Sequence, residues 1–167
     1  GLKSRFVISC NANDTVPRYL KSGIWDPHET IATLSNAMDI SRPNNWPRVE
    51  ALCRMQNWSL KDLDYGRLTD AQTEETMKDL YARTGYIAEP HAAIAYQVLK
   101  DKLRPGEIGV FLGTAHPAKF KGDVDRILGT DISLPQALQS KVKMESKAVT
   151  MKPDYAVLKG YVLKECR

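Results

Sequence analysis

The sequence predicts an α/β fold, specifically a partial three-layer α/β/α sandwich with few parallel strands and about six helices. Two short apolar runs that contain β-branched residues, Arg5–Cys10 and Glu107–Leu112, are typical of buried parallel strands. Most of the remaining chain shows helical spacing of apolar residues, with proline or glycine near the expected helix ends. Because two strands alone form only a marginally stable sheet, the sequence indicates that partner strands are missing.

The first strand is followed by an expected helix, with Asp14 as N-cap and Gly23 as its end. Pro17 is tolerated there because the amides of a first helical turn have no partner within the helix. Residues Ile24–Asn45 show no sustained period and are expected to form an ordered loop with at most a short strand. Long loops in compact domains are often functional. Apolar spacing over Trp46–Gln56 then predicts a second helix.

The rest of the chain contains further helical segments. Thr69 or Asp70 caps the first of them and Gly85 ends it, while Glu89 and Pro90 open the next, which carries a broad apolar face. Proline also lies at or just before the start of each later segment. The expected helices are Asp70–Thr84, Pro90–Lys102, Pro117–Leu128, Pro135–Lys141 and Tyr155–Lys164.

The bulk composition is that of an ordinary folded protein. The chain has 167 residues, 43% of them hydrophobic and 26% charged, and residues 1–167 are predicted to form a single α/β domain. The formal net charge is +4. The excess basic residues are spread along the chain and become denser toward its end, whereas a nucleic-acid site usually brings a focused basic stripe. We therefore expect no nucleic-acid partner.

The spacing of cysteine and histidine argues against a disulfide framework or a metal centre. Cys10, Cys53 and Cys166 are far apart and form no CxxC pair, and the three histidines are scattered. These features favour a reducing, cytoplasmic location and metal-independent chemistry. No stretch approaches the roughly 20 apolar residues of a membrane helix, so no membrane partner is expected. The sequence motifs of P-loop, dinucleotide-binding, zincin and hydrolase sites are absent.

The segment Phe111–Phe120 carries the strongest functional signal, because it joins a predicted strand to a hydroxyl, an imidazole and an ammonium group. In open α/β sheets, ligands bind outside the carboxyl ends of the strands. Thr114 could hydrogen-bond a heteroaromatic nitrogen without bringing a formal charge, or it could cap the helix that begins near Pro117. His116 and Lys119 could support a phosphate at that helix start, or they could be an ordinary loop residue and a solvated helix residue.

A second group of candidate side chains lies around the start of the Trp46 helix. Asn44, Asn45 and Arg48 could bind a phosphate or a carboxylate, although surface-loop chemistry explains them equally well. Residues Asn11–Arg18 follow the first strand and are interpreted mainly as scaffold, since Asn and Asp are common in strand-to-helix turns.

Four stretches of sequence carry a family resemblance: NDTVPR (13–18), SNAMD followed by PNNWPR (35–48), EPHAA (89–93) and FLGTAHPAKF (111–120). Together they closely resemble the carboxyl-terminal part of the threonine synthase family, whose members are pyridoxal phosphate (PLP) enzymes. The similarity extends from about Arg5 to Leu128 and is weaker from Ser133 to the end. In that fold family a Ser or Thr faces the pyridine nitrogen of PLP, so the resemblance implies that Thr114 binds the cofactor.

The resemblance implies an activity, the conversion of O-phospho-L-homoserine and water to L-threonine and phosphate. Two family motifs are absent from this chain: the segment near HGPTxAFKD that carries the Schiff-base lysine, and the SGNFG-like loop that holds the PLP phosphate. We therefore expect no catalytic residue here, no covalent attachment of PLP and no turnover by the isolated fragment. Exposed sheet edges could let the fragment self-associate.

Two other interpretations remain open. A different PLP enzyme of the same fold, such as a serine or threonine dehydratase or a tryptophan synthase β-like protein, would carry a different loop at Ser35–Arg48. A stand-alone binding domain that uses the basic tail would have a complete fold of its own.

Overall fold

The computed structural model describes residues 4–165 of the chain, so Cys166 lies outside the described residues. The chain divides into two compact units, the first ending at Ser133 and the second beginning at Leu134. The expectation that residues 1–167 form one domain stays a prediction.

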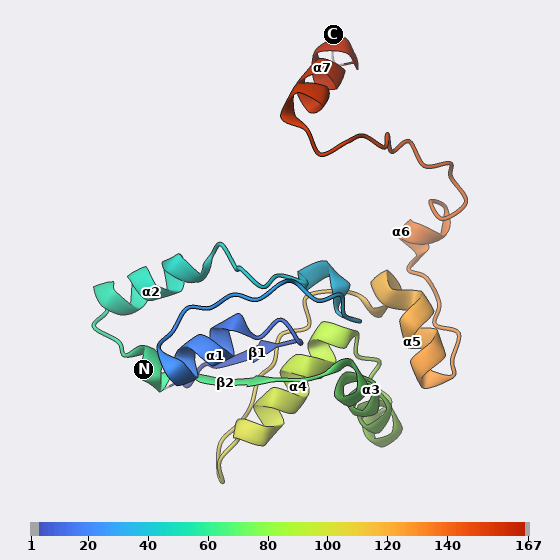
Figure 1. Cartoon of the computed structure of the whole chain (residues 1–167). Coiled ribbons are helices and arrows are strands. Elements are labelled where there is room, and N and C mark those ends of the chain that lie inside the picture. The colour runs from blue at the N-terminus through green and yellow to red at the C-terminus, as the bar shows by residue number, and fades with distance from the viewer. Residues whose placement is uncertain (1–3, 166–167) are drawn as a thin grey trace. The chain divides into compact units, whose positions relative to one another are not determined.

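The first unit contains a sheet of two parallel strands, β1 (Val7–Cys10) and β2 (Asp64–Arg67), with Val7 opposite Asp64 (Figure 1). Parallel pairing requires a crossover between the strands, and the chain between them supplies it with two helices and the long loop. β1 confirms the first predicted strand.

Seven α-helices and three short 3-10 turns are present among the described residues. In the first unit the helices are α1 (Thr15–Ser22), α2 (Trp46–Met55), α3 (Asp70–Thr84), α4 (Pro90–Lys102) and α5 (Lys121–Leu128). The 3-10 turns are η1 (Asn36–Met38), η2 (Leu60–Asp62) and η3 (Pro117–Phe120). The second unit contains α6 (Gln136–Gln139) and α7 (Tyr155–Glu165). The α/β prediction is confirmed, with a smaller sheet than a complete sandwich has.

Helix ends are set by local chemistry. α1 and α3 end at glycines in the left-handed region, Gly23 with φ +75° and Gly85 with φ +72°, as predicted. At the start of α3, the Thr69 hydroxyl accepts a hydrogen bond from the backbone N–H of Gln72, whose side chain accepts one from the Thr69 N–H. Asp14 occupies the N-cap of α1 but makes no side-chain capping bond there.

α4 packs against both strands and runs antiparallel to them. Near the end of the helix, the carbonyl oxygen of Lys102 accepts a hydrogen bond from Arg5, just before β1. Val98 packs closely on Gly66 in β2, where an added Cβ would lie 2.7 Å from Val98 Cγ1. The start of α4 therefore lies toward the carboxyl ends of the strands, where parallel-sheet proteins place their ligands.

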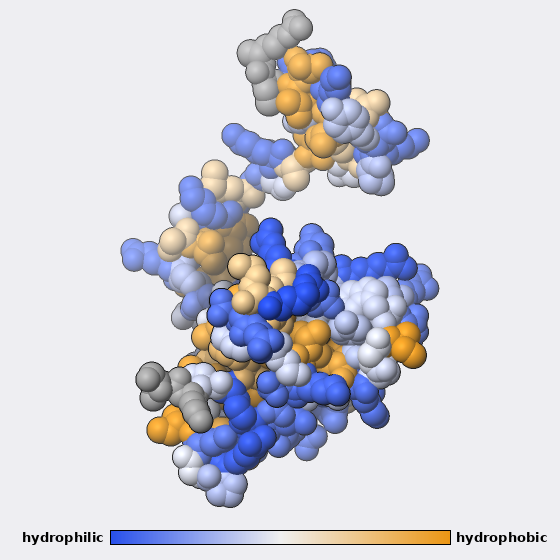
Figure 2. All heavy atoms as spheres, turned by 90° about the vertical axis from the view of Figure 1, so that its left-hand side faces the viewer, coloured by the Kyte–Doolittle hydropathy of each residue, from blue (hydrophilic) through white to orange (hydrophobic). Residues whose placement is uncertain are grey.

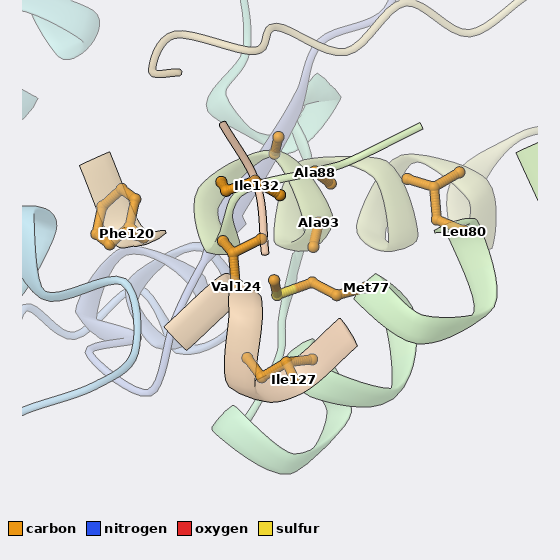
Figure 3. Packing of buried hydrophobic residues seen from close by; sticks show 9 residues of the cluster. Met77, Leu80, Ala88, Ala93, Phe120, Val124, Ile127 and Ile132 are labelled. Atoms are coloured by element: carbon orange, nitrogen blue, oxygen red, sulfur yellow. The ribbon is translucent and has the colours of Figure 1, made fainter. Parts of the chain in front are cut away.

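The main hydrophobic core lies between α3, α4 and α5 (Figure 3). Met77, Ala93 and Val124 contribute one fully buried side chain from each helix, and each has 0% of its surface exposed. The cluster consists of Met77, Leu80, Ala88, Ala92, Ala93, Phe120, Val124, Ile127 and Ile132. Because Phe120 belongs to η3, this core also anchors the segment predicted to carry the cofactor residue.

The predicted strand at Glu107–Leu112 is wrong for the described chain, in which these residues form neither helix nor strand. Ile108, Val110 and Leu112 are 94, 78 and 75% exposed, while Phe111 is partly buried against the main core. Exposed apolar side chains at every second position are typical of a strand with one face uncovered. Among the described residues, the segment has no backbone hydrogen-bond pairing with a neighbouring strand, and a strand is defined by that pairing.

β2 was not predicted from the sequence. Its four residues, DYGR, contain two charges and a glycine, a composition depleted in strands, and it forms because β1 offers a partner edge. The single helix predicted over Pro117–Leu128 is also wrong in detail, since it is divided into the 3-10 turn η3 and the α-helix α5.

The second unit consists of α6, α7 and connecting loops, and α7 confirms the predicted final helix. α7 has no buried residue, and several of its apolar side chains are exposed: Tyr155, Val157, Leu158, Tyr161, Val162 and Leu163. Figure 2 shows apolar patches on the otherwise largely hydrophilic surface. In the part of the chain that the structure describes, no helix has the length and apolar character needed to cross a membrane.

Candidate functional site at the carboxyl edge

The candidate site lies where β1 and the Glu107–Leu112 segment end and α4 begins. At the other end of the strands, just before β1 begins, the Arg5 side chain binds Glu107, the first residue of the segment. From there the segment follows α4 backward: Gly109 lies against Leu99 and Leu103, and the Phe111 ring packs edge-on against the Tyr96 ring. The segment therefore runs in the same direction as β1. We call the place where both end the carboxyl edge; it comprises Asn11–Asn13, Glu89–His91 and Gly113–Phe120.

A buried polar network ties the long loop to the end of β1. The Asn11 side-chain amide donates to Thr33 Oγ1 at 3.1 Å, Ser35 Oγ at 2.9 Å and Asp39 Oδ1 at 3.0 Å. Asn13 accepts from the backbone N–H of Ile31 at 2.8 Å and donates to the Asn11 side-chain oxygen at 3.1 Å. These bonds satisfy the buried amides of Asn11 and Asn13, so their role as scaffold follows from the geometry.

The candidate ligand-binding side chains Asn44, Asn45 and Arg48 are exposed around the start of α2. Asn45 is the N-cap of this helix but makes no side-chain capping bond. Among the described residues, no hydrogen bond or ion pair joins the three side chains to Gly113–Phe120, so the structure does not bring them together with Thr114 through direct bonds.

Thr114 is exposed, and its hydroxyl has no hydrogen-bond partner among the described residues. It does not cap the following helix, because the N-cap of η3 is His116. Gly113 precedes it beside Tyr86, and a Cβ added to Gly113 would lie 3.3 Å from the Tyr86 hydroxyl. A side chain at position 113 would therefore crowd the Tyr86 hydroxyl.

The other two candidates of this segment have local partners. His116 Nδ1 accepts a hydrogen bond from the Ala118 backbone N–H at 3.1 Å, which fixes the imidazole as the cap of η3. The Lys119 ammonium lies 5.4 Å from the centroid of the Phe120 ring, a cation–π distance. Both side chains remain exposed at the carboxyl edge.

The Glu89–His91 pair is a feature of the site that sequence reasoning missed. The Glu89 carboxylate, 1% exposed, accepts bonds from His91 Nδ1 at 2.7 Å and from the backbone N–H groups of His91 and Ala92, each at 2.8 Å. Burial acts to raise the pKa of Glu89, but these hydrogen bonds outweigh it and the net pKa is lowered. Glu89 is therefore an ionised cap of α4.

The signal for this pair was present as Glu-Pro-His at a helix start, where an acidic N-cap and a histidine two residues later share one turn. Nothing in the spacing shows that the pair is buried or that His91 packs on Phe120, with ring centroids 5.3 Å apart.

Cys10, at the end of β1, is not a nucleophile candidate. Burial, with a smaller contribution from the charge of Asp14, raises the pKa of its thiol to about 12, so the thiolate is scarce at neutral pH. No group of three or more potential metal-ligating side chains occurs in the residues described.

Comparison with protein families places this site in context. Residues 92–162 match the family model described as threonine synthase, C-terminal. Threonine synthase of Haemophilus influenzae is 58% identical over 160 residues, which cover 96% of this chain and 37% of the relative. Threonine synthase of Escherichia coli K12 is 52% identical over 159 residues, 95% of this chain and 37% of the relative. The chain thus spans little more than a third of the length of these relatives.

Solved structures show the same similarity. The crystal structure of threonine synthase from Escherichia coli has a TM-score of 0.91 and 50% identity, and the match covers 95% of this chain and 37% of that one. A PLP-bound threonine synthase from Brucella melitensis has a TM-score of 0.80 and 26% identity, with 97% of this chain and 40% of that chain covered.

Proposed function

Because this chain belongs to the threonine synthase family, we propose that it is the carboxyl-terminal segment of a PLP-dependent lyase that converts O-phospho-L-homoserine and water to L-threonine and phosphate. The observation that carries the proposal is 52–58% identity to threonine synthases over at least 95% of this chain. That level of similarity favours a threonine synthase over a dehydratase or a tryptophan synthase β-like protein. It also disfavours a stand-alone binding domain.

The geometry of the carboxyl edge fits PLP at Thr114. The exposed, unpartnered hydroxyl offers a neutral hydrogen bond to a ring nitrogen. When bound, PLP supplies an electron sink for the carbon next to the amino group of the substrate. Thr114 would orient the ring without adding a charge beside its nitrogen.

Other residues of this chain are assigned supporting roles. His116 and Lys119 stand on the first turn after the segment and would support an anionic group of the ligand. Asn44, Asn45 and Arg48 would bind a phosphate or carboxylate from the α2 side. We propose no catalytic role for any of these side chains.

The isolated chain is proposed to be inactive. A Schiff-base lysine must be desolvated and aimed at the cofactor, and the family motif that carries it is absent from this sequence. Titration of the chain with PLP should give no stoichiometric absorbance band that borohydride reduction fixes covalently. A stable, reducible one-to-one adduct would overturn this part of the proposal.

The setting of the reaction is proposed to be the cytoplasm, without a metal, nucleic-acid or membrane partner. Two cysteines of the described chain, Cys10 and Cys53, are free thiols, which suits a reducing compartment.

The proposed function is tested on the full-length protein that contains this chain. The purified, PLP-loaded protein should release phosphate from O-phospho-L-homoserine and form L-threonine in equal amounts. L-Serine and L-threonine, offered as substrates under the same conditions, should give little keto acid. Efficient keto-acid formation without phosphate release would identify a dehydratase instead.

A further inference from the structure

The imidazole of His91 has one nitrogen bonded and one nitrogen without a partner. Nδ1 binds the Glu89 carboxylate at 2.7 Å, whereas Nε2 is buried and has no hydrogen-bond partner among the described residues. Leaving a buried polar atom unpaired destabilises a folded protein, so each such atom calls for an explanation, for example a functional role or a bound group.

The chemistry of Glu89 decides which nitrogen carries the proton of the neutral ring. An ionised carboxylate only accepts hydrogen bonds, so Nδ1 must be the donor toward it. In the neutral tautomer that donates from Nδ1, Nε2 carries a lone pair and can accept a hydrogen bond. The same carboxylate accepts hydrogen bonds from backbone N–H groups in the first turn of α4, so it is fixed in place and orients the ring.

The position of His91 makes this acceptor relevant to the ligand. It lies in the first turn of α4 at the carboxyl edge, and its ring packs against Phe120, which ends the turn that follows Thr114 and His116. The His91 side chain keeps 22% of its surface exposed while Nε2 itself is buried, so the ring lies at the border between the core and the surface.

We propose that Nε2 of His91 accepts a hydrogen bond from a hydroxyl group of the ligand bound at the carboxyl edge. The proposal rests on the function proposed above. Two groups could supply this hydroxyl. One is the side-chain hydroxyl of zwitterionic L-threonine, and the other is the ring hydroxyl of PLP. The nearby negative charge of Glu89 favours a donor over an anion at this position.

The first test compares two amino acids in the PLP-loaded full-length protein, with binding followed by the absorbance of the cofactor. L-Threonine carries the hydroxyl and L-2-aminobutyrate lacks it. His91→Asn is the informative variant, because its amide can still donate to Glu89 from the Nδ1 position but has nothing at the Nε2 position. His28→Asn is the matched control, since His28 is an exposed histidine of the long loop.

The wild-type protein should bind L-threonine about tenfold more tightly than L-2-aminobutyrate, the ratio expected for one hydrogen bond to a buried acceptor. His91→Asn should lose this preference, while His28→Asn should keep it. Equal preference in the wild type and His91→Asn would contradict a threonine hydroxyl as the partner.

Nitrogen-15 NMR of the wild-type protein provides a second readout that does not require the variant to fold. A change in the Nε2 shift with PLP alone would assign the cofactor hydroxyl as the donor. A change only after L-threonine is added would assign the amino-acid hydroxyl. No change in either step, or an equal change with L-2-aminobutyrate and L-threonine, would overturn the proposal. Failure of the proposed function appears separately, as absent phosphate release in the assay above.

Discussion

Arg5 binds Glu107 through two parallel hydrogen bonds, from Nε to Oε1 at 3.0 Å and from Nη2 to Oε2 at 2.6 Å. The same guanidinium also pairs with Asp64 at the start of β2 and donates to the carbonyl oxygen of Lys102 at the end of α4. One side chain therefore joins β1, β2, α4 and the Glu107–Leu112 segment. It holds that segment near the sheet although no ladder of backbone hydrogen bonds does so.

This arrangement predicts a pH dependence of stability. The hydrogen bonds from Arg5, aided by the Arg104 backbone N–H, lower the pKa of Glu107 from 4.5 to about 2. A carboxyl whose pKa is lower in the folded state contributes stability that is present above pH 4.5 and lost as the pH falls toward 2. In urea unfolding, the difference in stability between the wild type and Glu107→Gln should be largest at neutral pH and vanish near pH 2.

The matched control is Glu29→Gln, because Glu29 is exposed and forms no ion pair among the described residues. It should change stability little at any pH. A difference between the wild type and Glu107→Gln that stays constant from pH 7 to pH 2 would show that the Arg5 contact does not set the protonation of Glu107.

Met77→Ala should strongly destabilise the first unit. The Met77 side chain is fully buried between α3, α4 and α5, and truncating such a residue costs about 2–5 kcal/mol through lost burial and the cavity left behind. Met55→Ala is the control, since Met55 ends α2 with 80% of its surface exposed. Comparable losses from both variants in chemical denaturation would contradict the position of the core.

Gly66→Ala should destabilise the protein through a clash with Val98. The added Cβ would lie 2.7 Å from Val98 Cγ1, and overpacking of this kind costs about 1–3 kcal/mol. Combining it with Val98→Ala should relieve the clash. The loss of stability in the double variant should therefore be smaller than the sum of the losses in the two single variants.

Gly122→Ala serves as the comparison for this clash. A Cβ at Gly122 in α5 meets no atom within 4 Å, so this change should be neutral or stabilise the helix by about 0.5–1 kcal/mol. Additive losses in the Gly66 and Val98 double variant would show that the two positions are not in contact.

Val110→Lys should reduce self-association of the chain. Ile108, Val110 and Leu112 form a row of exposed apolar side chains on an unpaired extended segment. Charged residues on such segments prevent pairing between molecules. Sedimentation velocity should show concentration-dependent assembly of the wild type that the substitution lowers. Met55→Lys, at an exposed apolar site on α2, should leave assembly unchanged, and an equal effect of both would rule out this edge.

Thr114→Val should weaken PLP binding by the full-length protein about tenfold, while Thr114→Ser should stay near the wild-type affinity. Valine keeps the shape but removes the hydroxyl, and serine keeps the hydroxyl. Fluorescence titration of the cofactor-free protein with PLP measures both. Equal affinity of the valine and serine variants would show that the hydroxyl does not bind the ring.

Local signals in the sequence predicted the helices well. The ends of α1 and α3 at Gly23 and Gly85 were predicted, and the N-cap of α3 was narrowed to Thr69 or Asp70, because each depends on the residues of a single turn. Thr114 was also chosen locally, as a hydroxyl after a glycine at the end of an apolar run, and its role with PLP stays a proposal.

Strand formation depended on residues far apart in the chain. The apolar segment Glu107–Leu112 has the pattern of a strand but pairs with no other strand of the described chain, whereas the polar β2 is a strand because β1 lies beside it. Backbone pairing between segments separated by some 57 residues, as for Val7 and Asp64, leaves no trace in the local pattern of either one.

By itself, the sequence determined where most helices lie, several of their ends, and which family motifs the chain carries, because capping and spacing act within a few residues. Only the tertiary structure decided that Arg5 holds Glu107, that Glu89 is buried and ionised, and that one nitrogen of His91 has no partner within residues 4–165. Burial and hydrogen-bond satisfaction are set by neighbours that distant parts of the chain bring together, so local sequence patterns do not encode them.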